Sequence, residues 1–323
     1  MKILEVKINK FKYKNSKEII LKNLSLSVEP GELIVITGLS GCGKTTLTRI
    51  LNGLIPNHYE GDLDGEVKLF DKNLPDYEKG ELAKYIGNVF QNPSDQFFAT
   101  IAEEEVAFVG ENLGMPLEEL KRKTKEAFEK MGISDLMDKK LSELSGGQKQ
   151  KVAIASTLLY DTKIIFFDEP SSNLDYQGIA QFRDIVRTLK EMGKAIIIAE
   201  HRLFFLNDLY DRLIYMKDGT IERVFSQGEL TENDCKKYGL RAISYRSLKA
   251  QNLGAEQEKA ASIVDLNINI GKQELIKNLS FNLHYGEIMA IIGKNGIGKT
   301  TLGRTLAGLI KNKGEISYGK TTK

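Results

Sequence analysis

The chain carries one nine-residue pattern twice, as GLSGCGKTT at residues 38–46 and as GKNGIGKTT at residues 293–301. Residues 21–55 align with residues 276–310 without a gap, and 19 of the 35 aligned positions are identical. The offset of 255 residues is far longer than the period of a solenoid repeat. We therefore interpret the pattern as a duplicated domain.

Both copies fit the phosphate-binding pattern G-x-x-x-x-G-K-[ST]. Glycines leave no Cβ between the backbone and a phosphate, and successive N–H groups with a helix N-terminus attract an anion. Lys44 is expected to reach the β and γ phosphates of a nucleotide, and Thr45 to place its hydroxyl on Mg²⁺. The predicted contacts are Gly38, Ser40, Gly41, Cys42, Gly43, Lys44, Thr45 and Thr46 in the first loop, and Gly293, Asn295, Gly296, Gly298, Lys299, Thr300 and Thr301 in the second.

Apolar periodicity predicts an α/β fold with a parallel core, because strand-like and helix-like segments alternate. The expected half-exposed antiparallel strands are residues 2–8 and 21–28, and the expected buried strands are 33–37, IIFF at 164–167 and 195–199. A hairpin is expected at Asp218-Gly219. The expected helices are residues 44–51, 117–131, 135–141, 148–160 and 177–191.

The repeat also suggests a domain division. Residues 1–235 have room for a complete domain, residues 236–262 are expected to be a linker, and residues 263–323 contain only the beginning of a second copy. The apolar run 288–292 of that second copy should be a buried strand, yet the copy includes no neighbouring strands for it. We therefore expect a truncated piece that is poorly ordered by itself.

Two further segments complete a nucleotide site. The buried strand in IIFFDEP delivers Asp168 to hold the Mg²⁺ shell and Glu169 to orient or deprotonate a water, although two acids after a strand can also be a surface turn. ELSGGQKQK places Ser145, Gly146 and Gly147 before a helix. Ser145 can cap that helix, and a capped glycine-rich helix start also binds phosphate.

With these motifs the sequence resembles the ATPase subunits of ABC transporters, in full over residues 1 to about 235 and in part over 263–323. The resemblance implies a P-loop ATPase domain with a parallel core sheet flanked by helices, an antiparallel β subdomain and a helical subdomain. It implies that ATP is held between one domain's phosphate loop and another domain's LSGGQ signature. The roles it implies are: Gln91, a Mg²⁺ and water ligand that senses a membrane partner; Ser145, Gly146, Gly147 and Gln148, the signature; Asp168 and Glu169, the Walker B pair; Asp175, the D-loop; His201, the switch histidine; and Tyr13, or else Phe11, the aromatic residue that stacks on adenine.

LNGLIPNHYEGDLDGEV, QNPSDQFFATIAEEEVAFVGENLGMP and AEHRL resemble the energy-coupling-factor subgroup, which imports vitamins and metal ions. This resemblance implies a transmembrane coupling subunit, a substrate-binding membrane subunit and a location on the cytoplasmic face of the membrane. It also implies a second ATPase domain from a longer chain, a homodimer or a paralogue. The groove near Asp95–Phe98 and the acidic run 103–105 would receive coupling helices. The acidic run can equally be a solvated helix start.

The second copy departs from this pattern. It offers only Ile268 or Ile270 where an aromatic residue is expected, and it lacks the glutamine loop, signature, Walker B strand and switch histidine. The net charge of +2 gives no strong attraction to nucleic acid, two cysteines make no disulfide framework, and no apolar run approaches the roughly 20 residues of a bilayer span. Two alternatives stay open: a soluble tandem ABC ATPase acting on ribosomes or DNA, and an inactive nucleotide-binding fragment.

Overall fold

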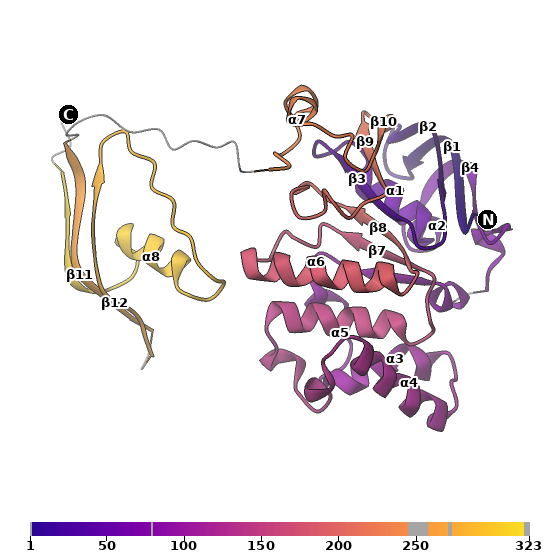
Figure 1. Cartoon of the computed structure of the whole chain (residues 1–323), viewed down its shortest axis with the longest axis horizontal. Coiled ribbons are helices and arrows are strands. Elements are labelled where there is room, and N and C mark those ends of the chain that lie inside the picture. Colours follow the sequence, from indigo (N-terminus) through magenta and orange to yellow (C-terminus); the bar gives the residue numbers. More distant parts are fainter. Residues whose placement is uncertain (1, 79, 245–257, 271–272, 320–323) are drawn as a thin grey trace. The chain divides into compact units, whose positions relative to one another are not determined.

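The computed structural model of the chain describes residues 2–78, 80–244, 258–270 and 273–319. It contains two compact units, Met1–Arg246 and Ser247–Lys323, which are described separately (Figure 1). The first unit extends beyond the expected boundary at residue 235, because helix α7 (Glu232–Tyr238) packs Cys235 and Tyr238 into its core. Most of the expected linker, residues 245–257, lies outside the described residues.

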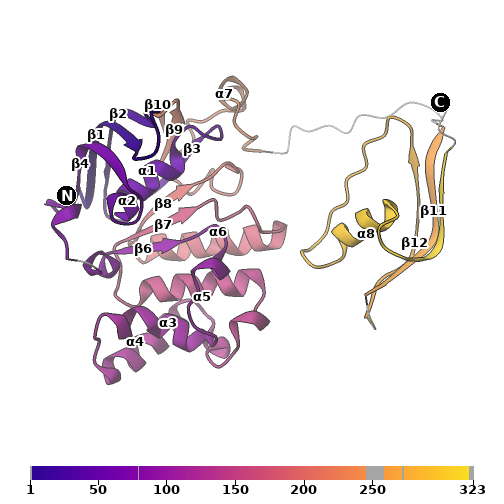
Figure 2. The same ribbon diagram turned by 180° about the vertical axis from the view of Figure 1, so that it is seen from behind.

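A six-stranded sheet in the order β10-β9-β3-β8-β7-β6 forms the centre of the first unit. β3 pairs in parallel with β8 and β9, and β7 pairs in parallel with β6 and β8, as Figure 2 shows from behind. β10 is antiparallel to β9 through the predicted hairpin, whose turn residues Asp218 and Gly219 both have positive φ. The strands are β3 (Leu33–Gly38), β6 (Ile86–Val89), β7 (Ile164–Asp168), β8 (Ala195–Ala199), β9 (Arg212–Lys217) and β10 (Thr220–Ser226).

The central strands are buried on both faces, as their continuous apolar runs predict. Leu33 and Val35 of β3 enter the core that lies against the helices, whereas Ile34 and Ile36 enter the core shared with the second sheet. This alternation follows from the period of two in a strand. The sheet is therefore fixed from both sides, and its carboxyl edge is held in one place.

A second, antiparallel sheet in the order β2-β1-β4-β5 lies against α1, and the helices α3, α4 and α5 contact one another. The predicted antiparallel pairing of the first two strands is confirmed, and the first strand continues to Tyr13. The remaining elements are β1 (Leu4–Tyr13), β2 (Leu21–Val28), β4 (Gly61–Leu69), β5 (Lys72–Asn73), α1 (Lys44–Leu51), α2 (Leu54–Asn57), α3 (Ala102–Asn112), α4 (Leu117–Lys130), α5 (Gly146–Leu158) and α6 (Tyr176–Glu191).

The helix predicted at 135–141 is wrong. Two short 3₁₀ turns, Ser134–Leu136 and Leu141–Glu143, flank a turn that ends in a single β-bridge between Lys140 and Ile101. Leu141 N–H donates to the carbonyl of Thr100, and Ala102 N–H donates to that of Lys139. These backbone bonds to the start of α3 replace the bonds that a helix would make within the segment.

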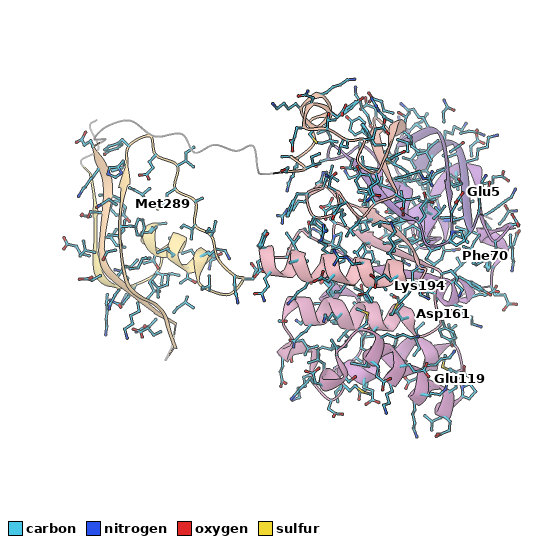
Figure 3. The ribbon with its side chains drawn as sticks, in the orientation of Figure 1. Glu5, Phe70, Glu119, Asp161, Lys194 and Met289 are labelled. Atoms are coloured by element: carbon cyan, nitrogen blue, oxygen red, sulfur yellow. The ribbon has the colours of Figure 1, made fainter. Side chains whose placement is uncertain are left out.

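The second unit reproduces part of the antiparallel sheet of the first unit, in the order β12-β11-β13, and the helix after the phosphate loop. The apolar run 288–292, which corresponds to β3, belongs to no strand, and Ile288 and Ile292 are 96% and 90% exposed. Met289 of this run is labelled in Figure 3. The elements are β11 (Lys259–Ile270), β12 (Gln273–His284), α8 (Lys299–Leu306) and β13 (Lys313–Tyr318).

Candidate nucleotide site

The first phosphate loop connects the buried strand β3 to helix α1. Gly38, Gly41 and Gly43 have φ of 149°, 80° and 102°, values that L side chains rarely adopt. The ammonium of Lys44 donates to the carbonyls of Gly38 at 3.0 Å and of Leu39 at 3.1 Å, and the side chain is only 5% exposed. The loop is thus already wound around the lysine that the sequence predicts to meet phosphate.

Two of these glycines have close neighbours, and Gly38 is required by packing. A Cβ on Gly38 would lie 2.3 Å from the carbonyl oxygen of Met216 on β9, and one on Gly43 would lie 2.7 Å from a methyl group of Leu21 on β2. A Cβ on Gly41 would meet nothing within 4 Å. Sequence reasoning assigned all three glycines to phosphate clearance, whereas the backbone of β9 accounts for Gly38; the methyl group beside Gly43 ends a flexible side chain that can shift.

The predicted adenine residue, Tyr13, lies at the end of β1 beside the loop. Its hydroxyl is 3.2 Å from the hydroxyl of Thr46, and Arg49 Nη1 donates to it at 3.5 Å. The alternative, Phe11, is fully buried and packs edge-on against Tyr13. Of Phe11 and Tyr13, Tyr13 is therefore the one whose ring is partly exposed. Its stacking on a base stays a prediction.

Asp168 ends β7 at the carboxyl edge of the sheet, in register with Ala199 of β8. Its Oδ1 is buried and has no hydrogen-bond partner among the described residues. Burial, and then the charge of Glu169, raise the pKa of Asp168, while Arg49 and Lys44 oppose the shift. An unpartnered buried carboxylate oxygen fits a hard cation such as Mg²⁺, which prefers oxygen ligands.

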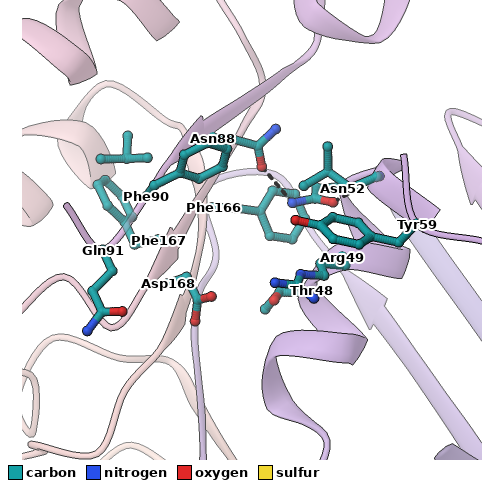
Figure 4. Close-up of a pocket in the computed structure, with 12 residues that line it drawn as sticks. Thr48, Arg49, Asn52, Tyr59, Asn88, Phe90, Gln91, Phe166, Phe167 and Asp168 are labelled. Carbon is teal, nitrogen blue, oxygen red and sulfur yellow. Dashed lines mark hydrogen bonds between the residues drawn. The ribbon is translucent and has the colours of Figure 1, made fainter. Parts of the chain in front are cut away.

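Asp168 also lines a cavity of about 250 Å³ that opens between α1 and the segment after β6. Figure 4 shows its carboxylate between the amide of Gln91 and the side chains of Thr48 and Arg49. Arg49 in turn stacks on the ring of Tyr59 at 4.1 Å. The structure thus brings two of the three predicted metal residues to one cavity; the third, Thr45, is the second residue of α1.

Glu169 and His201 follow β7 and β8, which are neighbours in the sheet. Glu169 Oε1 lies 3.3 Å from His201 Nε2. Burial, and then the positive charge of Lys44, lower the pKa of His201, so the imidazole is neutral at pH 7. Glu169 has a φ of 45°, a strained conformation of the kind that concentrates at functional sites. Sequence reasoning named both residues, and the structure adds their contact.

The signature begins α5. Ser145 accepts from Gln148 N–H at 3.4 Å, and Gln148 Oε1 accepts from Ser145 N–H at 2.9 Å, which completes a capping box. Ser145 and Gly146 are exposed, so the helix tip is open at the surface. The predicted N-cap role of Ser145 is confirmed. Asp175 similarly caps α6 by accepting from Gly178 N–H at 2.8 Å.

The second phosphate loop has the same conformation as the first. Lys299 donates to the carbonyls of Gly293 at 2.7 Å and Lys294 at 2.8 Å, matching the contacts of Lys44. A Cβ on Gly293 would meet only the side chain of Ile297, at 3.1 Å. The corresponding Cβ on Gly38 of the first loop would meet the carbonyl oxygen of Met216 on β9. Ile268, one of the two candidates for the adenine position, is fully buried; the side chain of the other, Ile270, lies outside what the structure describes.

Sequence reasoning missed two buried carboxylates. Glu200, quoted above only within AEHRL, is 2% exposed and accepts three backbone N–H groups. Glu105 accepts from Phe98 N–H at 2.8 Å and Ala99 N–H at 2.9 Å. The acidic run does begin a helix, α3, but the interpretation of it as solvated is wrong for Glu105, because this residue is buried. No sequence period distinguishes a carboxylate that binds backbone N–H groups from one that faces water.

Alanine substitutions can separate the two roles of the loop glycines. We expect Gly38→Ala to lower the free energy of unfolding by about 3 kcal/mol, because its Cβ collides with backbone. Gly41→Ala, the matched control with positive φ but open space, should cost about 1 kcal/mol. Urea unfolding of both variants measures the difference, and equal losses would contradict the packing argument.

The raised pKa of Asp168 predicts that replacing this carboxylate stabilises the fold in a pH-dependent way. Because its pKa is raised in the folded chain, the protonated form stabilises the fold at low pH, and this contribution is lost as pH rises through the folded pKa. At pH 7 without metal, Asp168→Asn should therefore raise the unfolding temperature. The gain should vanish below about pH 4, where Asp168 is protonated in both states. Calorimetry in EDTA at both pH values tests this, and a lower unfolding temperature of the variant at pH 7 would exclude it.

Across the described ranges, no helix combines the length and apolarity that a bilayer-spanning segment needs. The family model described as "ABC transporter" matches residues 21–172 and again residues 276–322. The putative ABC transporter ATP-binding proteins of Treponema denticola and Methanosarcina acetivorans are 39% and 33% identical over 95% and 90% of this chain. The chain spans 65% and 56% of their lengths.

Two solved structures have the same fold. cbiO1 from Clostridium perfringens, described as part of the ABC transporter complex cbiONQ, aligns at 30% identity and a TM-score of 0.63 over 73% of this chain and 93% of its own. The ATP-binding cassette MJ0796, solved as a dimer bound to ADP and Pi, aligns at 30% identity and a TM-score of 0.59 over 70% of this chain and all of its own. The phosphate loops, the Walker B strand, the capped signature helix and these matches lead to one conclusion: the chain belongs to the ABC transporter ATP-binding family.

Proposed function

We propose that the first unit binds ATP with Mg²⁺ and hydrolyses it as the energy-coupling subunit of a membrane ABC importer. The observation that carries the proposal is the contact of Glu169 with His201 at the carboxyl ends of neighbouring strands, in the same site as Lys44. Ligands of open α/β sheets bind at this edge. A base beside a phosphate loop is the arrangement that hydrolysis of a phosphoanhydride needs.

Each residue has a defined part in this proposal. The loop amides and Lys44 hold the β and γ phosphates, for which Lys44 leaves the carbonyls of Gly38 and Leu39. Glu169 orients a water and accepts its proton while the water oxygen bonds to the γ phosphorus and the bond to the β-phosphate oxygen breaks. Neutral His201 can donate one N–H to the γ phosphate. Thr45, Asp168 and Gln91 would hold Mg²⁺, which supplies positive charge to the phosphate oxygens.

The second unit supports a tandem arrangement. We infer that residues 263–323 are the front of a second ATP-binding domain, because sheet order, phosphate-loop φ angles and lysine contacts repeat those of the first unit. The family's ATP sandwich would pair the phosphate loop at Lys44 with the signature of another ATPase domain. The open helix tip at Ser145 would face the phosphate loop of that other domain.

The importer type is inferred from the energy-coupling-factor resemblance and from the likeness to cbiO1. The proposed partners are a transmembrane coupling subunit and a substrate-binding membrane subunit for a vitamin or a metal ion, at the cytoplasmic face of the membrane. Phe98 offers a docking surface: it is 76% exposed and stacks on Phe108 at 4.9 Å. Glu105 holds the backbone of Phe98 and Ala99, so this surface is fixed before a partner arrives.

Replacing the carboxylate of Glu169 tests the catalytic proposal. Glu169→Gln should reduce ATP turnover by roughly 10²- to 10⁴-fold, because the proton acceptor is lost, and should leave ATP affinity near the wild-type value. Lys44→Ala, as a contrast, should lose ATP affinity. Turnover and equilibrium binding are measured on the full chain, alone and with an intact partner ATPase. Multiple turnover by Glu169→Gln at the wild-type rate would refute the role.

The docking surface gives a second test. We expect the full chain to bind the membrane fraction of cells that contain the transporter, and Phe98→Asp to reduce the bound fraction at least about tenfold, since a charge replaces an apolar anchor. Leu117→Asp, at an exposed apolar position on α4, is the matched control and should bind normally. Recovery with ribosomes instead of membranes, or normal membrane binding by Phe98→Asp, would contradict the proposal.

A further inference from the structure

Glu200 lies at the centre of the site without any role in the reaction proposed above. It follows β8, which sits between β3 and β7 in the sheet, and its own N–H donates to the carbonyl of Ile36 on β3 at 3.0 Å. Its carboxylate is 2% exposed. A buried carboxylate is costly unless it is fully hydrogen-bonded, so its partners indicate its purpose.

Those partners come from two different loops. Oε1 accepts from the N–H groups of His201 at 2.7 Å and Arg202 at 2.9 Å, in the loop after β8. Oε2 accepts from Ser171 N–H at 3.2 Å, in the loop after β7 that begins with Glu169. Arg202 closes the ring, since its guanidinium donates to the carbonyl of Ser171 at 3.2 Å. Glu200 therefore ties the loop of the base to the loop of the histidine, and Arg202 adds a second bond between the two loops.

The tie also bears on the geometry of Glu169. Glu169 has a positive φ, and its N–H donates to the carbonyl of Ala199 at 2.8 Å. Two residues later, Ser171 is held by Glu200. These two bonds anchor the strained turn at both ends, so that the side chain of Glu169 stays within reach of His201.

We propose that Glu200 is a positioning residue that locks the loop of Glu169 to the loop of His201 and so sets the distance between them. This inference rests on the proposed ATPase function. Glu200 touches neither substrate nor reacting atoms; it acts through the backbone of its neighbours.

Glu200→Gln is the sharp variant because it keeps the size of the side chain. Its oxygen can still accept from His201 and Arg202, but its NH₂ group then faces the N–H of Ser171, so the bond from residue 200 to the loop of Glu169 is lost and the bond from Arg202 to Ser171 remains. Glu32→Gln is the matched control: Glu32 is also a largely buried carboxylate that accepts a backbone N–H, from Glu29, and binds Arg212, before the amino end of β3.

The first measurement is steady-state ATP hydrolysis by the full chain with its partner ATPase. Glu200→Gln should lower kcat about tenfold or more, because a small misplacement of a catalytic group is costly, and change KM less than about twofold. Glu32→Gln should leave both constants at the wild-type value. A kcat for Glu200→Gln within twofold of an active wild type overturns the inference and leaves the proposed function standing.

The second measurement does not depend on turnover. The chain has three histidines, so the titration of His201 can be followed by NMR and assigned by its loss in His201→Asn. Burial, and then the charge of Lys44, lower the pKa of His201; the charges of Glu169 and Glu200 raise it, and that of Arg241 lowers it. Glu200→Gln should therefore shift the titration of His201 to lower pH, and Glu32→Gln should not. If the wild type hydrolyses no ATP, the proposed function fails, and an unshifted His201 titration in Glu200→Gln then overturns the positional role as well.

Discussion

The site depends on the close approach of β3 to β9 at Gly38. The strand is buried on both faces and its last residue lies directly against the carbonyl of Met216, so the chain has no room for a side chain there. It turns away from the sheet at that point and winds into the loop around Lys44. The Walker B acids and the switch histidine reach the same edge because β7 and β8 run in the same direction as β3: Asp168 is in register with Ala199, and Ala199 pairs with Ile36 of β3. The two hydrophobic cores on either side of the central sheet hold this edge in place.

The second unit shows which features of the phosphate loop depend on the central sheet and which do not. Its φ angles and its lysine contacts are those of the first loop, although the run corresponding to β3 forms no strand. The loop conformation is therefore local, encoded by the glycines and the following helix. The sheet contributes the acids, the histidine and the burial that shifts the pKa values of Asp168 and His201.

Much of this arrangement could be read from residue patterns. The buried strands, the hairpin, the phosphate loop and the residues of the Glu169–His201 pair all follow from local periodicity, from glycine spacing or from resemblance to a family. The failures share one physical cause: each depends on backbone groups outside the residue's own helix or strand. The stretch at 135–141 does not form a helix because it bonds to the start of α3, and Glu105 and Glu200 are buried because they bind loops that local sequence does not reveal. The packing requirement at Gly38 comes from β9, about 180 residues later (216 − 38 = 178).

The ammonium of Lys44 donates to two carbonyls of its own loop. A ligand must therefore exchange these bonds for its own, and it gains only the difference. A neutral or singly charged molecule offers little advantage over two peptide oxygens, whereas the tail of a triphosphate offers several charged oxygens at once. The two carbonyl bonds of Lys44 thus favour ligands that carry a high density of negative charge.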